Sequence, residues 1–132
     1  MKKTIFLFAL LIVHATVMHV KSHGLETADH FKLKCDQNFI RIKQNGQIEL
    51  TFSITRSKKY QGRALQVMID QVPKGIDVDL EKIFISNDNF KIVLNATSQS
   101  IPGKHIMVIS LKDKYRKNGT MIPLQIEPDT SK

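Results

Sequence analysis

Two short basic stretches of this sequence hold the side chains best suited to binding a partner. TRSKKYQGR at 55–63 and KDKYRK at 112–117 each place four cations around one tyrosine. Lysine and arginine attract anions, and a tyrosine ring offers flat contact area or stacks on a sugar or base. The residues that we predict to contact a partner are Arg56, Lys58, Lys59, Tyr60, Arg63, Lys112, Lys114, Tyr115, Arg116 and Lys117.

The charge balance points to the same two stretches. The chain has a formal net charge of +8, and removal of an N-terminal signal with Lys2, Lys3 and Lys21 leaves +5. The two stretches hold eight cations and one acid, Asp113. Their combined net charge is therefore larger than that of the whole exported chain. They predict an anionic partner: a sulfated or otherwise anionic glycan, a lipopolysaccharide or an acidic protein. The alternative is a pair of solvated loops whose charges only discourage strand pairing between molecules. No nucleic-acid-binding motif is present.

A copper site is an alternative function for four other side chains. His105, Met107, Met121 and Cys35 offer the imidazole and soft sulfur that suit copper. The further ligand spacing of periplasmic copper carriers is absent, and methionine is a common core residue. We therefore predict that these residues are structural, with Cys35 either a buried thiol or part of an intermolecular disulfide.

The acidic residues and the single histidine of the expected fold do not form a pattern typical of a metal, cofactor or catalytic site. We therefore predict no metal, no cofactor and no catalysis. Asp77, Asp79 and Glu81 could ligate calcium, but they alternate with apolar residues, as on the solvent face of a strand. One histidine, His105, lies within the expected fold, so no Ser-His-Asp set can form. No glycine-rich phosphate loop is present either.

The N-terminus is typical of an export signal. Lys2 and Lys3 precede the apolar run 5–13, which is too short to span a bilayer, where about 20 residues are needed. We expect cleavage after Ser22, with Gly24 as the alternative, and a soluble secreted or periplasmic product without a transmembrane span or lipid anchor. The predicted division is a signal peptide at 1–22, a flexible tail at 23–30, one domain at 31–127 and a fraying tail at 128–132.

The elements that must position the basic stretches are strands. In QIELTFSIT at 47–55, apolar and polar residues alternate, which is the pattern of a strand with one buried face. Similar runs occupy 31–35, 39–43, 64–70, 75–80, 89–96, 104–111 and 121–126. Turn signals separate them, among them Asn118-Gly119. The pattern predicts an all-β fold with an antiparallel β-sandwich of about seven to nine strands.

The glycines and prolines between these strands are placed as in the Ig-like modules of secreted bacterial proteins, which the chain resembles. Gly46 stands before strand B, Pro73 and Gly75 follow strand C, and Pro102-Gly103 opens strand F, over about residues 38–127. The chain departs from the family by having His105 where a tyrosine is usual. The resemblance implies that the basic stretches are the B–C and F–G loops, at one end of the sandwich. It also implies a non-catalytic binding or adhesion module; the alternative is an accessory protein that holds another envelope protein by a sheet edge or loop.

Overall fold

The computed structural model describes residues 30–131, which form nine strands and one 3₁₀ turn. The predicted signal peptide and cleavage site lie outside the described residues. The elements are β1 (Phe31–Cys35), β2 (Ile40–Lys43), β3 (Gln47–Arg56), η1 (Lys58–Tyr60), β4 (Leu65–Gln71), β5 (Ile76–Leu80), β6 (Phe84–Ile85), β7 (Asn89–Ala96), β8 (Gly103–Lys112) and β9 (Lys117–Glu127). None of the described residues belongs to a helix long and apolar enough to cross a membrane.

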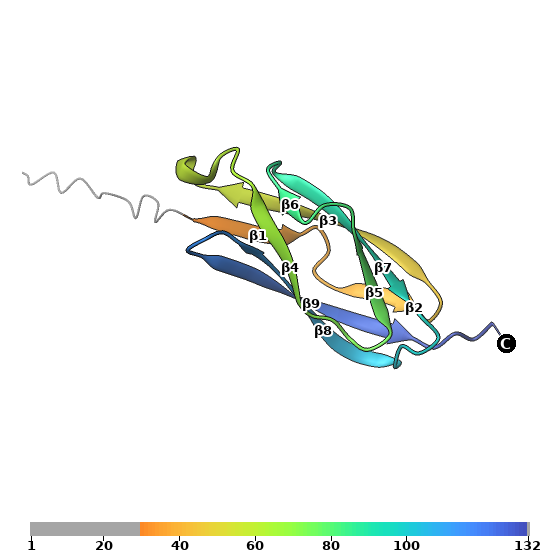
Figure 1. Cartoon of the computed structure of the whole chain (residues 1–132). Coiled ribbons are helices and arrows are strands. Elements are labelled where there is room, and N and C mark those ends of the chain that lie inside the picture. Colours follow the sequence, from red (N-terminus) through yellow and green to blue (C-terminus); the bar gives the residue numbers. More distant parts are fainter. Residues whose placement is uncertain (1–29, 132) are drawn as a thin grey trace, which may run out of the picture.

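The strands form the two sheets of a sandwich (Figure 1). One sheet has the order β1-β3-β7-β5 and the other the order β2-β9-β8-β4-β6. The prediction of an all-β sandwich is confirmed, but not every pair is antiparallel, because β2 runs parallel to β9. The chain passes from β1 in one sheet to β2 in the other, so the N-terminal segment closes an edge of each sheet.

Alternation of apolar and polar residues builds the core between the sheets. In β1, Phe31, Leu33 and Cys35 are buried while Lys32 and Lys34 are exposed. Strands β3, β7, β8 and β9 each send every second side chain into the same core. Each fully buried aliphatic or aromatic side chain contributes about 1.5–3 kcal/mol by leaving water.

The turn between β8 and β9 does not lie where the sequence predicted it. Asn118 and Gly119 belong to β9, where they pair with Leu111 and Ser110 of β8. The hairpin instead closes at the pair Lys112–Lys117. The prediction of an Asn-Gly turn is therefore wrong, and the four turn residues 113–116 all belong to the second basic stretch.

Two smaller features also differ from prediction. The two-residue strand β6, which pairs with the start of β4, is too short for a pattern of alternation. The C-terminal tail does not simply fray, because the Asp129 carboxylate accepts a hydrogen bond from Asn45 and its backbone N–H donates to the Gln44 side chain.

Candidate functional site

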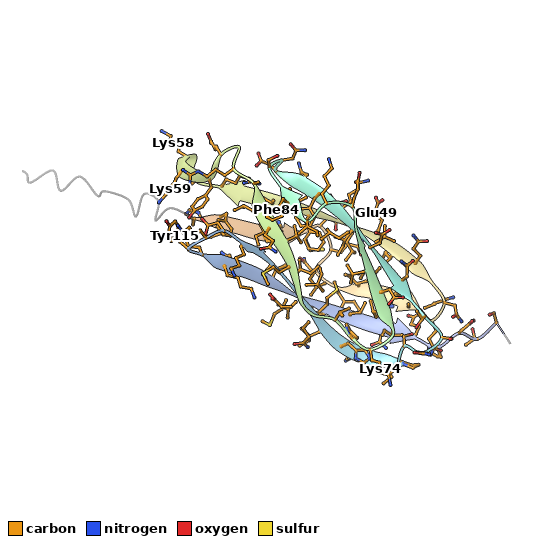
Figure 2. The ribbon with its side chains drawn as sticks, viewed as in Figure 1. Glu49, Lys58, Lys59, Lys74, Phe84 and Tyr115 are labelled. Atoms are coloured by element: carbon orange, nitrogen blue, oxygen red, sulfur yellow. The ribbon has the colours of Figure 1, made fainter. Side chains whose placement is uncertain are left out.

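The two basic stretches meet at one end of the sandwich. Lys58, Lys59 and Tyr115 lie together at the end where β1 begins, and Lys74 lies at the opposite end (Figure 2). The Tyr60 hydroxyl, from the first stretch, hydrogen-bonds to the Asp113 carboxylate of the second. The prediction that the two stretches share one end is confirmed, and we call this end, residues 56–63 and 112–117, the basic pole.

Asp113 shapes the turn of the basic pole. Its carboxylate accepts hydrogen bonds from the backbone N–H groups of Tyr115 and Arg116, at 2.8 and 2.6 Å, and its own N–H donates to the Arg116 carbonyl. Such an Asx turn needs no Asn-Gly pair. Desolvation acts to raise the pKa of Asp113, but these hydrogen bonds and the one from Tyr60 outweigh it and lower the pKa.

Replacement of Asp113 by alanine is expected to loosen the turn in a pH-dependent way. At pH 7 the variant should lose about 1 kcal/mol of unfolding free energy, since these are partly exposed charge-assisted bonds. The lowered folded pKa means that the stabilisation is complete above about pH 4 and disappears as the pH falls through the folded value. Urea unfolding from pH 7 to pH 2.5 should show the two proteins converging, whereas a constant gap would contradict this role.

Tyr115 is the most exposed aromatic side chain of the described residues, at 79%. The Lys114 ammonium lies 5.3 Å from the centroid of its ring, which places a cation against the aromatic face. Beside it runs a groove of about 410 Å³, lined by His30, Phe31, Tyr115, Arg116, Lys117 and Asn118. A flat ring, cations and a groove thus lie together, as contact with an anionic chain requires.

Arg56 does not belong to the exposed part of the pole. Its side chain is 2% exposed, and its guanidinium forms an ion pair with Asp88 at 3.0 Å. The remaining donors bond to the backbone carbonyls of Tyr60, Arg63, Ile85 and Asn87. The prediction that Arg56 contacts a partner is corrected, because it instead ties the B–C segment to the segment before β7.

Tyr60 is also structural. Its ring is buried and packs edge-on against Phe31, with the ring centroids 5.0 Å apart. The Arg63 guanidinium lies 6.0 Å from the Tyr60 centroid and covers the ring from the exposed side. The prediction that Tyr60 presents its ring to a partner is therefore corrected. Tyr60 instead stabilises the turn through its hydrogen bond to Asp113.

Lys117 is partly held by the sheet. Its ammonium forms an ion pair with Asp70, which also accepts a hydrogen bond from the buried Ser110 hydroxyl. Lys117 and Ser110 together lower the pKa of Asp70. The other cations of the pole carry exposed side chains, and these are Lys58, Lys59, Arg63, Lys112, Lys114 and Arg116.

The structure does not assemble the candidate copper set. Met107 is buried in β8, whereas Met121 is exposed on β9, opposite the outward-facing Val108. Cys35 is a buried free thiol in the other sheet, and burial raises its pKa, which keeps it protonated. Its predicted burial is confirmed.

His105 has a structural partner. Its Nε2 lies 2.7 Å from the Ile101 carbonyl oxygen, so Nε2 carries the proton in this contact. The imidazole therefore makes a bond back to the chain upstream, as the family's tyrosine does at this corner.

The candidate calcium ligands lie along an edge strand and beyond it. Asp77 and Asp79 are exposed on β5, and Glu81 follows the strand. Among residues 30–131, no group of three or more His, Cys, Asp or Glu side chains is placed to hold a metal ion.

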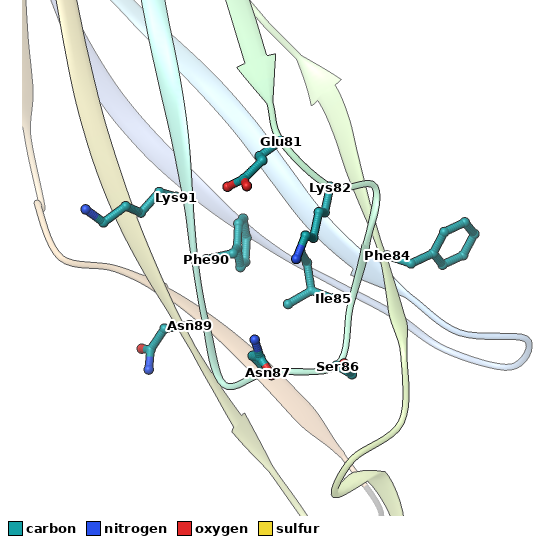
Figure 3. Close-up of a pocket in the computed structure, with 9 residues that line it drawn as sticks. All are labelled: Glu81, Lys82, Phe84, Ile85, Ser86, Asn87, Asn89, Phe90 and Lys91. Carbon is teal, nitrogen blue, oxygen red and sulfur yellow. The ribbon is translucent and has the colours of Figure 1, made fainter.

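A pocket opens at the edge of the sandwich between β5, β6 and β7 (Figure 3). Its volume is about 160 Å³, and its lining combines Phe90 and Ile85 with Glu81, Lys82, Asn87 and Lys91. Ligand pockets usually measure about 300–1,000 Å³, so this one is too small for a typical ligand. No feature of the sequence predicted this pocket, because it depends on the course of the β5–β7 connection.

Comparisons with known proteins support the fold. A conjugative transposon lipoprotein from Bacteroides eggerthii is similar in structure, with 9% sequence identity and a TM-score of 0.57 over 71% of this chain and 95% of that one. The ICAM-5 D1–D4 ectodomain fragment gives a TM-score of 0.51 at 8% identity, over 79% of this chain and 24% of the fragment. Domains 4–9 of the surface layer protein SbsC give 0.50 at 11% identity, over 75% and 14%.

These likenesses confirm the resemblance to Ig-like β-sandwiches. At such low identity they show the fold alone, and function must be argued from the surface of this chain. No protein-family model matches the chain, and no curated protein matches it in sequence.

Proposed function

We propose that this protein is an exported, non-catalytic Ig-like module that binds an anionic partner through its basic pole. The observation that carries the proposal is the union of two stretches about fifty residues apart into one cationic surface around the exposed Tyr115. The groove beside Tyr115 gives an anionic chain a place to lie along the cations. The signal-like N-terminus supports export to the periplasm or beyond, where anionic glycans and lipopolysaccharides occur.

The electrostatics of the pole determine how such binding should behave. Exposed cations raise the local concentration of anions and speed their encounter. Interactions between exposed charges are screened within about 8 Å at physiological ionic strength. Binding should therefore weaken strongly with salt, and the Tyr115 ring should supply the part of the affinity that salt does not remove.

Charge reversal at the pole is expected to abolish retention on a heparin column. The variant carries Lys58→Glu, Lys59→Glu, Lys114→Glu and Arg116→Glu, all at exposed positions. The unmodified protein should elute at a clearly higher salt concentration, since the variant presents acids where the ligand's sulfates would lie.

A matched control separates the pole from net charge. Lys34→Glu, Lys43→Glu, Lys74→Glu and Lys82→Glu make the same change in net charge at exposed lysines elsewhere. The control should retain most of the heparin affinity, and circular dichroism should show both variants folded. Equal loss of retention in the two variants would refute a site at the pole.

A further inference from the structure

The outer face of the five-stranded sheet carries apolar side chains where a solvated strand carries polar ones. In β8, Met107 and Ile109 are buried in the core, yet the outward-facing Ile106 and Val108, which alternate with them, are apolar too. In β9, Met121 and Pro123 face outward beside the buried Ile122. An antiparallel sheet with one wet face alternates, whereas continuous apolar runs are typical of strands covered on both faces.

The strand register gathers these side chains into one stripe. Ile106 lies opposite Pro123, and Val108 lies opposite Met121. Phe39, which directly precedes β2, extends the stripe. A hollow of about 530 Å³ at this end of the stripe is lined by Phe39, Gln71, Lys104, His105, Ile106, Pro123 and Leu124. Met121 is 71% exposed, Ile106 49% and Phe39 44%.

A separate aromatic side chain is exposed at the other edge of this sheet. Phe84 of β6 pairs with Gln66 and is exposed. Figure 3 shows its ring pointing away from the other residues that line the pocket. Gln66 and Lys112 lie between Phe84 and the stripe, so the stripe itself covers β8, β9 and the start of the β2 edge.

The opposite face of the molecule shows that this is not a general property of the chain. The outward positions of β1, β3, β5 and β7 include Lys32, Lys34, Glu49, Thr51, Ser53, Asp77, Asp79, Lys91 and Asn95. Among the described outward residues of these strands, Val93 is the apolar exception. A soluble protein rarely exposes a large contiguous apolar patch unless it is an interaction site.

The charged residues around the stripe indicate which kind of partner can bind it. The cations that border the stripe on this face are Arg41, Lys43, Lys104, Lys112 and Lys117. The acids of the described part of this face are Asp70, which is bonded to Lys117 and Ser110, and Glu127, which lies opposite Lys43. A second copy across a twofold axis would bring the same face, with its excess of positive charge, against this one. An acidic protein surface meets them with opposite charge.

We infer that the outer face of the five-stranded sheet docks a partner protein that presents apolar side chains within an acidic frame. This inference goes beyond the proposed function. It shares Lys112 and Lys117 with the basic pole, but the apolar stripe on which it rests lies outside the pole. Apolar burial supplies the affinity at the stripe, and the cations orient the partner. Binding at this face should therefore persist at 0.5 M salt, unlike binding of a polyanion at the pole.

Site-specific cross-linking tests the inference in the cells that produce the protein. A photoreactive benzoylphenylalanine replaces Met121 in the full chain, and the matched control carries it at Val93 on the opposite face. We expect position 121, but not 93, to capture one acidic protein, which is identified by mass spectrometry and purified. In a titration of that protein, Ile106→Ser combined with Met121→Ser should raise Kd by about tenfold or more, and Val93→Ser should not.

Four outcomes would overturn the inference. They are an adduct of two copies of this chain, an adduct with lipid, equal capture from positions 121 and 93, and an unchanged Kd in the double variant. Reversal of Lys58, Lys59, Lys114 and Arg116 should leave the titration at 0.5 M salt unchanged. A failed heparin experiment would therefore refute binding at the basic pole, and a failed cross-linking experiment would refute docking at the outer face of the five-stranded sheet.

Discussion

Replacement of Arg56 by methionine is expected to remove about 3–5 kcal/mol from the free energy of unfolding. The change leaves the carbonyls of Tyr60, Arg63, Ile85 and Asn87 without this donor and separates the exposed Asp88 from its cation. A part-buried hydrogen bond to a charged group contributes about 1.5–3 kcal/mol, and the exposed bonds and the ion pair with Asp88 add less. The two part-buried bonds therefore account for most of this loss. The melting temperature should fall by about 12 °C or more, as measured by calorimetry.

Two further variants separate this role from simple loss of charge. Arg56→Lys keeps the charge but not the planar fork of donors, so most of the loss should remain. Arg63→Met removes an exposed guanidinium that covers the Tyr60 ring and should cost less than about 1 kcal/mol. The structural assignment of Arg56 fails if Arg56→Met is no more destabilising than Arg63→Met.

Replacement of Gly75 by alanine is expected to cost at least about 3 kcal/mol. Gly75 has a φ of +79°, and a Cβ there would lie 2.3 Å from Ser100 N and 2.6 Å from the Gln99 carbonyl carbon. Its own carbonyl accepts hydrogen bonds from the Thr97 N–H and hydroxyl, so the turn cannot move away without losing them. Backbone strain and a clash with main-chain atoms therefore combine.

Gly62 provides the matched control for this prediction. It has a similar φ of +68°, and nothing lies within 4 Å of an added Cβ. Gly62→Ala should therefore show the backbone penalty alone, about 1–2 kcal/mol. Equal losses in the two variants, measured by urea unfolding, would mean that the contact with the 97–100 turn is unimportant.

Strands were the most predictable part of this molecule. The alternation in FKLKC predicted β1 with its observed bounds, and QIELTFSIT predicted all of β3 except its last residue, Arg56. Burial on one face enforces the pattern, because a shift of one residue would expose the whole apolar set. The parallel pairing of β2 with β9 left no such signal, since alternation indicates a strand but not the direction of its neighbour.

The basic pole was predictable in its location but not in its details. The positions of the two stretches followed from the order of the strands. The burial of Arg56 and Tyr60 did not, because the polar stretch TRSKKYQGR gives no sign that distant residues, Ile85 and Asn87, supply carbonyls to the Arg56 guanidinium. The turn was misplaced because an Asn-Gly pair is a strong local signal, whereas the carboxylate of Asp113 acts through backbone groups two and three residues ahead.

An NMR titration of the protein with a heparin oligosaccharide shows whether the basic pole binds an anionic partner. Binding at the pole should produce chemical-shift changes concentrated at residues 58–63 and 113–117 and on the Tyr115 ring, and these changes should diminish as salt is added. Unchanged spectra, or changes spread evenly over the lysines of the whole surface, would mean that the pole is not a binding site.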